Sequence, residues 1–156
     1  MSDKLSAAET SVVIVVSEFN QPIIENLLQG ALKAFAHHGG KESDISIYRV
    51  PGAFEIPGTI QQIMKFHNPH AIVALGAVIK GETAHFDYIA GESARGIAEI
   101  SRNANIPIIN GILTTDTARQ AEDRSQVDGR NKGWDAIESA LKTISIYQEI
   151  FSASKC

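Results

Sequence analysis

The sequence predicts an α/β protein in which a four-stranded parallel sheet lies between two layers of helices. Three observations support this prediction. Four apolar runs have the length of strands, helical patterns separate them, and the two central runs are nearly continuous in apolar residues, as in parallel strands buried on both faces. Strands and helices in this alternation form parallel sheets with right-handed crossovers, so we expect a three-layer α/β/α sandwich.

Four strands and a first helix can be placed along the chain. The predicted strands span residues 12–16, 45–50, 71–78 and 106–113. A helix lies between the first two strands, with Asn20 as its predicted N-cap and Gly39 and Gly40 as its end. Its apolar residues recur at helical spacing: Ile24, Leu28, Ala31 and Phe35.

Two further helices flank the third strand. One runs from about Phe54 to Phe66 and ends before Pro69, because the residue before a proline disfavours helical backbone. The other follows Thr83. Their inward residues are Ile60, Ile63 and Met64 in the first helix and Phe86, Ile89, Ile97 and Ile100 in the second.

Two helices follow the fourth strand. Thr117 and Gln120 have the spacing of a capping box, which predicts a short helix. A long final helix presents an apolar stripe formed by Ile137, Leu141, Ile144 and Phe151. Because parallel α/β sheets bind ligands outside the carboxyl ends of their strands, the residues after each strand are the candidates for function.

Length and composition indicate a single folded unit. The 156 residues are 44% hydrophobic and 21% charged, and the polar residues 1–10 lack the order of a secretory signal. We therefore expect a flexible N-terminal arm over residues 1–10 and one domain over 11–156. No apolar run is long enough to cross a membrane, and a net charge of −4 without a basic cluster argues against nucleic acid as a partner.

Cysteine and histidine usage narrows the chemistry. The one cysteine, Cys156, is the last residue, so no disulfide can form within the chain and a cytoplasmic compartment fits best. Cysteine catalysis and Cys-based zinc sites are excluded. The histidines other than His85 lack partners at metal-ligand spacing, so we expect no metal, and small molecules or proteins are the expected partners.

Common catalytic signatures are incomplete in this chain. Residues 76–81 have the glycine spacing of a P-loop, but Glu82 stands where the lysine should be. Residues 91–95 begin like a nucleophile elbow and lack its closing glycine. The candidates that remain are the strand-end segments 17–20, 50–57, 76–85 and 110–116.

The third of these segments is the most informative. Gly81, Glu82 and Thr83 lead into a helix whose unpaired N–H groups and positive dipole end can bind an anion. We place His85 in the first helical turn, where the dipole disfavours the imidazolium form and leaves a neutral imidazole that can relay protons. Arg124, on the short fourth helix, is suited to complete a phosphate clamp.

Each of these residues also has a purely structural interpretation. His85 then satisfies backbone groups at a helix start, Phe19 packs at the rim, and Arg124 is a solvated helix charge. Spacing alone does not decide between the two interpretations.

Five segments together resemble the lumazine synthase family in order and spacing: residues 19–20, 50–57, 74–86, 111–115 and 131–133. The Pro-Gly-Ala-Phe-Glu run at 51–55 combined with the Gly-Glu-Thr-Ala-His-Phe run at 81–86 is the specific part of this match. The resemblance implies a flavodoxin-like fold. It also implies an enzyme that condenses 5-amino-6-(D-ribitylamino)uracil with 3,4-dihydroxy-2-butanone 4-phosphate, without metal or organic cofactor.

The resemblance also implies roles for individual residues. His85 transfers protons, and Arg124 of a neighbouring subunit binds the phosphate together with Glu82 and Thr83. Asn110 stands where many relatives have phenylalanine, so an amide replaces aromatic packing at the uracil edge. The pyrimidine site as a whole consists of Phe19, Ala53, Phe54, Glu55, Ala77, Val78, Ile79 and Asn110.

The implied assembly is a ring of five subunits, with riboflavin synthase as a further partner. Residues 126–131 depart from the turn found in icosahedral relatives, so we expect a free pentamer or a pair of pentamers rather than a shell of sixty chains. Two other interpretations stay open at this point. One is a non-catalytic homologue that binds lumazine or flavin, and the weaker one is a flavodoxin-like electron carrier.

Overall fold

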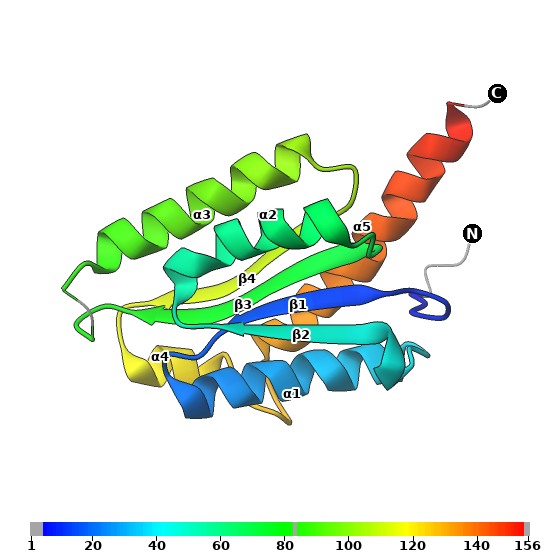
Figure 1. Cartoon of the computed structure of the whole chain (residues 1–156). Coiled ribbons are helices and arrows are strands. Elements are labelled where there is room, and N and C mark those ends of the chain that lie inside the picture. The colour runs from blue at the N-terminus through cyan, green and yellow to red at the C-terminus, as the bar shows by residue number, and fades with distance from the viewer. Residues whose placement is uncertain (1–4, 83, 155–156) are drawn as a thin grey trace.

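A computed structural model, which describes residues 5–82 and 84–154, confirms the three-layer architecture (Figure 1). Its flavodoxin-like sheet contains four parallel strands: β1 (Val12–Ser17), β2 (Ile45–Val50), β3 (Ala71–Ile79) and β4 (Ile108–Thr115). Their order is β2-β1-β3-β4, so the strand order reverses between β1 and β3. In such sheets the crevice at the reversal is the favoured place for a ligand.

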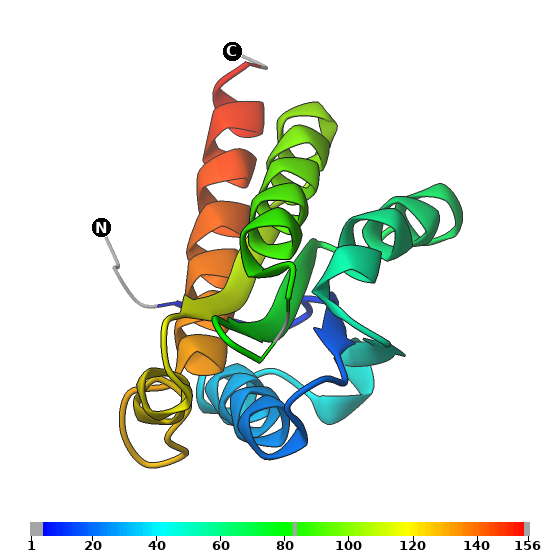
Figure 2. The ribbon, with the colours of Figure 1, turned by 90° about the vertical axis from the view of Figure 1, so that its left-hand side faces the viewer.

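Helices cover both faces of the sheet (Figure 2). One face carries α1 (Gln21–His37) and α5 (Lys132–Ala153), with the short α4 (Ala118–Asp123) beside them. The other face carries α2 (Ile56–Phe66) and α3 (Phe86–Asn103). Two 3₁₀ turns, η1 (Glu42–Asp44) and η2 (Ala53–Glu55), precede β2 and α2.

Alternation along β1 divides the core into two clusters. Ile14 faces α1 and α5, whereas Val15 faces α2 and α3, and both side chains are fully buried. Burying one such aliphatic side chain contributes about 1.5–3 kcal/mol. β1 and β3 are buried throughout, but β2 lies at an edge and exposes most of its residues, so the expectation of burial on both faces is wrong for this strand.

The helix signals in the sequence correspond to real caps. The N–H groups of Gly39 and Gly40 donate to the carbonyls of Ala36 and Phe35, and Gly39 adopts a φ of 90° that favours glycine. Thr117 and Gln120 form the predicted capping box at α4.

Several element boundaries differ from the prediction. β4 begins at Ile108, two residues late, because Pro107 has no N–H to donate to a strand ladder. α2 begins at Ile56, after η2, and α3 begins at Phe86, one residue after His85. Phe86, Ile89 and Ile100 are only partly buried, and Phe151 is 61% exposed because the end of α5 extends beyond the sheet (Figure 1).

The segment before β1 contacts the domain. Ala7 is fully buried, and its N–H donates to the carbonyl of His38 at the end of α1 over 2.8 Å. Residues 5–10, assigned to the arm, therefore touch the core, and the domain boundary at residue 11 stays a prediction. Within the described parts of the chain, no helix combines the length and apolar composition needed to cross a bilayer.

Candidate active site

An apolar pocket of about 190 Å³ opens at the carboxyl ends of β1 and β3, where the strand order reverses. It is lined by Phe19, Pro51, Gly52, Ala53, Ala77, Val78, Ile79 and Ile89, and we call it the apolar pocket. The structure thus brings together five residues that the sequence analysis assigned to a pyrimidine site: Phe19, Ala53, Ala77, Val78 and Ile79. Its floor is rigid because the last residues of β3 are buried.

A left-handed residue holds Phe19 at the rim of this pocket. Asn20 has φ 70° and ψ 58°, a conformation that asparagine tolerates better than most residues. Asn20 occupies the predicted N-cap position of α1, but its side chain makes no capping hydrogen bond. Instead its Nδ2 donates to the carbonyl of Ala77 on β3 over 3.4 Å. This contact ties the turn to the sheet, while Phe19 stays 53% exposed.

A second pocket of about 470 Å³ adjoins the first, and we call it the His85 pocket. It is lined by Phe54, Glu55, His85, Tyr88 and Ile89, and Ile89 belongs to both pockets. The Phe54 and Tyr88 rings stack, with centroids 6.0 Å apart. Sequence reasoning missed Tyr88, although an aromatic residue three positions after His85 was a usable signal.

His85 lies immediately before α3 rather than within its first turn. Its φ of −117° and ψ of 37° are not helical, and its carbonyl accepts the N–H of Ile89 over 2.9 Å, which begins the helix. His85 is exposed and, like Glu55, lines the His85 pocket. A side chain in this place can exchange protons with a molecule that occupies the pocket.

A main-chain hydrogen bond closes the turn that follows β3. Gly81 has a φ of 90°, and the N–H of Glu82 donates to the carbonyl of Ile79 over 3.2 Å. A phosphate bound by this N–H would have to share or displace that hydrogen bond. Thr83, the other residue predicted here, lies outside the described residues.

Arg124 belongs to a different pocket. This pocket of about 400 Å³, which we call the cationic pocket, is lined by Ile112, Leu113, Thr114, Arg124, Arg130, Asn131, Lys132 and Asp135. Arg124 is the C-cap of α4 rather than a residue within it. Neither Phe19 nor His85 lines the cationic pocket, so one chain carries two separate groups of predicted site residues.

Asn110 lines none of these pockets and lies exposed in the edge strand β4. Its Oδ1 accepts the N–H of Ile112 over 3.0 Å. One lone pair of the side-chain oxygen is therefore used within its own strand, while the Nδ2 donor is directed to no partner that this contact supplies.

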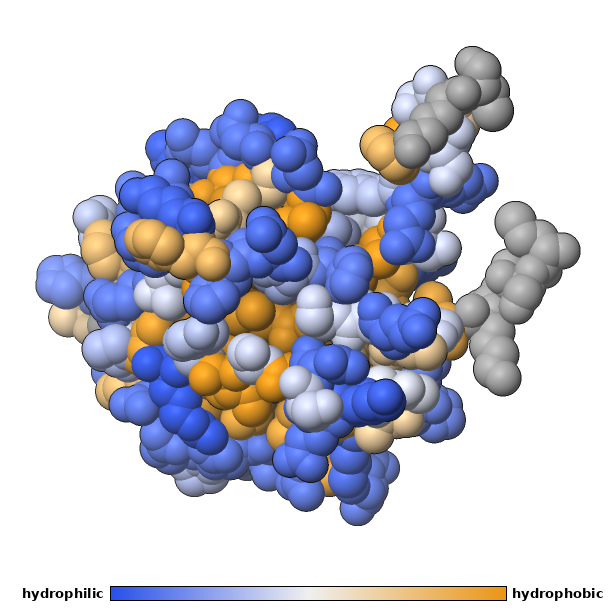
Figure 3. Space-filling model, turned by 45° about the vertical axis from the view of Figure 1, so that its right-hand side comes forward, coloured by the Kyte–Doolittle hydropathy of each residue, from blue (hydrophilic) through white to orange (hydrophobic). Residues whose placement is uncertain are grey.

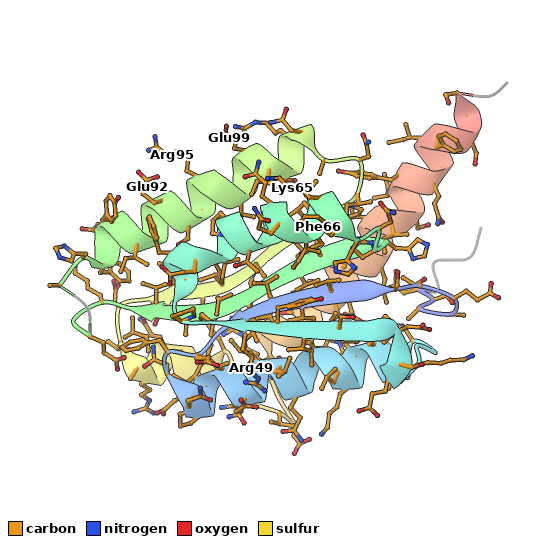
Figure 4. All side chains as sticks on the ribbon, viewed as in Figure 1. Arg49, Lys65, Phe66, Glu92, Arg95 and Glu99 are labelled. Atoms are coloured by element: carbon orange, nitrogen blue, oxygen red, sulfur yellow. The ribbon has the colours of Figure 1, made fainter. Side chains whose placement is uncertain are left out.

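Charged groups elsewhere form no comparable site. Among the described residues, no three His, Cys, Asp or Glu side chains are grouped so that they can hold a metal ion. Arg49 on β2 donates to Glu25 over 2.6 Å, and this hydrogen bond raises the pKa of the Arg49 guanidinium on the surface of the molecule (Figure 4). Arg95 and Glu99 project from the outer side of α3 (Figure 4), whereas Glu92 on the same helix lines a further pocket with Phe54 and Glu55.

Comparison with known proteins gives a consistent result. The family model for 6,7-dimethyl-8-ribityllumazine synthase matches residues 9–148. A 6,7-dimethyl-8-ribityllumazine synthase of Chloroherpeton thalassium is 42% identical over 146 residues, which cover 94% of each protein. One from Campylobacter jejuni is 41% identical over 143 residues, covering 92% of this chain and 93% of that protein.

Proposed function

The chain belongs to the 6,7-dimethyl-8-ribityllumazine synthase family, and on this premise we propose that its active site is divided between two subunits. The chain catalyses the reaction of the family, a step of riboflavin biosynthesis. It condenses 5-amino-6-(D-ribitylamino)uracil with 3,4-dihydroxy-2-butanone 4-phosphate and forms 6,7-dimethyl-8-ribityllumazine, phosphate and water. In the proposed arrangement, the apolar and His85 pockets of one chain face the cationic pocket of the next.

The pyrimidine occupies the apolar pocket. Phe19 stacks on the ring, an arrangement worth about 0.5–1.5 kcal/mol beyond the burial of area. The short side chains of Ala53 and Ala77 let the ring approach main-chain groups, with Val78 and Ile79 beside it. Phe54 and Glu55 carry the contact surface onward into the His85 pocket, where the ribityl side and the amino group lie.

His85 moves the protons of the reaction. The 5-amino group attacks the ketone and a first water leaves as the imine forms. The imine then loses phosphate, and ring closure releases a second water, so protons must be taken up and given back several times. An imidazole does this well because its ordinary pKa lies near the working pH. The position of His85 in the wall of a pocket that adjoins the apolar pocket supports this role.

The butanone phosphate lies between the subunits. Arg124 of the neighbouring chain binds the phosphate, because a guanidinium matches phosphate oxygens with two parallel hydrogen bonds. Glu82 and Thr83 contribute from the His85 side through their main chain, since the Glu82 carboxylate itself would repel the anion. Asn110 of the neighbour offers its Nδ2 to the uracil edge.

A ring of five chains is the proposed active unit. The two groups of site residues occupy different parts of one chain, and a head-to-tail interface between neighbouring chains of a closed ring brings them together. Exposed apolar surface supports an assembly. The edge strand β2 leaves Ile47 and Tyr48 about 40% exposed, and hydrophobic residues gather at the centre of the face in Figure 3. We favour a free pentamer or a pair of pentamers in the cytoplasm, with riboflavin synthase, which consumes the product, as a partner.

The observation that carries this proposal is the apolar pocket, which unites Phe19, Ala53 and Ala77 directly beside the pocket of His85. Its test is to mix the purified protein with both substrates and follow the absorbance and fluorescence of lumazine against the spontaneous reaction. We expect formation well above that background. A yellow protein that carries flavin and gives only the spontaneous rate would contradict the proposal and favour a binding protein.

A further inference from the structure

The connection between α4 and α5 folds back on itself like a short hairpin. Ser125 and Asn131 form an isolated antiparallel bridge. On one side of it, the N–H of Lys132 donates to the carbonyl of Arg124 over 2.9 Å, and on the other the N–H of Gln126 donates to the carbonyl of Arg130 over 2.9 Å. Residues distant along the loop are therefore held side by side.

Alternation along this hairpin separates a buried face from an exposed one. Ser125 and Asn131 are 1% and 4% exposed, so they point into the protein. The residues that flank them in the chain, Arg124, Arg130 and Lys132, are more exposed. All three of these basic residues line the cationic pocket.

Asn131 fixes this arrangement from beneath. Its Nδ2 donates to the carbonyl of Asn26 on α1 over 2.9 Å, and its Oδ1 accepts the N–H of Trp134 over 3.0 Å. A Cβ added at Gly30 would lie 2.1 Å from the Asn131 side chain, so α1 leaves just enough space for it. The backbone that carries Arg130 is therefore anchored to the core rather than free.

The pocket carries more positive charge than its own chain neutralises. Asp135 is the one carboxylate that lines it, against three cations. Within residues 5–82 and 84–154, none of these three cations forms an ion pair. A phosphate monoester has a charge near −2 at neutral pH, so one guanidinium leaves part of that charge uncompensated.

We propose that Arg130 is a second phosphate-binding residue, acting beside Arg124 on the phosphate of the four-carbon substrate. The inference rests on the proposed function, in which this pocket receives that phosphate. Both arginines line the same pocket, and their guanidinium groups are permanently charged donors. Phosphate recognition here uses a pair of arginines held on one loop.

The test compares Arg130→Gln with Arg119→Gln, which removes the same charge from α4 outside the pocket. We expect Arg130→Gln to raise the KM for the butanone phosphate about tenfold, and the inhibition constant of inorganic phosphate by a similar factor. The KM for the pyrimidine and the melting temperature should stay unchanged. Arg130→Lys should recover part of the loss, and Arg119→Gln should match the parent.

Three results would overturn the inference: an unchanged KM in Arg130→Gln, an equal rise for both substrates, or the same effect in Arg119→Gln. Titration calorimetry with inorganic phosphate separates this question from the proposed function. If the parent formed no lumazine, the proposed function would fail, whereas weaker phosphate binding by Arg130→Gln than by the parent would still support the arginine pair. Equal phosphate binding by both proteins would refute it.

Discussion

The apolar pocket and the cationic pocket are built in opposite ways. The first rests on β1 and β3, which are buried along their whole length, and in the proposed function it recognises a ring through backbone shape and one aromatic side chain. The second lies along an edge strand and a hairpin, and in the proposed function it recognises a phosphate through long charged side chains. Ring recognition is thus tied to the fold, whereas charge recognition can change without disturbing the core.

The largest effect is expected from replacing Asn131, which anchors the hairpin that carries the cationic pocket. Asn131→Ala removes the side-chain hydrogen bond to the Asn26 carbonyl of α1 and the side-chain cap of α5. We expect a loss of about 3 kcal/mol in the free energy of unfolding, measured by urea denaturation. Asn103→Ala, which removes an exposed asparagine at the end of α3, should cost less than about 0.5 kcal/mol. Similar losses in both variants would show that Asn131 is no special anchor.

The next largest effect concerns proton transfer on the apolar side. His85→Ala should lower kcat about a hundredfold. This is a small loss for an acid–base group, and we expect no larger one because imine formation also proceeds without the enzyme. The unfolding free energy should not change, since the imidazole is exposed. His67→Ala, an exposed histidine after α2, is the control for both measurements. If His85→Ala equals the parent at saturating substrates across neutral pH, His85 has no proton-transfer role.

Arg124 tests the cationic side alone. Arg124→Gln should raise the KM for the butanone phosphate about thirtyfold, because a charge-assisted contact is worth roughly 2 kcal/mol. The KM for the pyrimidine should move by less than about twofold. Steady-state kinetics with each substrate varied in turn gives both constants. Equal changes in the two constants would mean that the pockets do not divide recognition as described.

Phe19 tests the apolar side with the smallest expected effect. Phe19→Leu keeps apolar volume and removes stacking, so the KM for the pyrimidine should rise about fivefold. The KM for the phosphate substrate should be unaffected. Phe66→Leu, at the exposed end of α2, should alter neither constant (Figure 4). A rise for the phosphate substrate instead would place Phe19 outside the pyrimidine site.

The fold was largely predictable because its signals are local. Buried strands showed as apolar runs, and Gly39, Gly40 and the Thr117–Gln120 pair marked helix ends through their own backbone and side-chain chemistry. The exposure of β2 depends on its place at the edge of the sheet, which strand order decides, but Ser46 and Arg49 within the strand were a usable sign of it. The shift at β4 was readable in principle, since Pro107 cannot donate to a ladder.

The residues of the candidate site were predictable only where they belong to a recognisable sequence motif at the end of a strand. Phe19, Ala53 and Ala77 meet in one pocket as the strand-end argument requires. That argument could not show that the Nδ2 of Asn20 would bind Ala77 instead of capping α1, or that the N–H of Glu82 would be used within its own turn. The sequence did not identify Arg130 as a site residue, because its place in the same pocket as Arg124 depends on the hairpin pairing of Ser125 with Asn131.

Subunit mixing tests the divided site most directly. His85→Ala chains keep Arg124, and Arg124→Gln chains keep His85, so co-expression of both variants creates interfaces at which each chain supplies the intact half. With random assembly of equal amounts, about a quarter of the interfaces are intact in both halves. We therefore expect about a quarter of the parent activity when the butanone phosphate is held well below its KM, where each variant alone is nearly inactive. Activity no higher than the average of the two separate variants would contradict it, because each site would then lie within one chain.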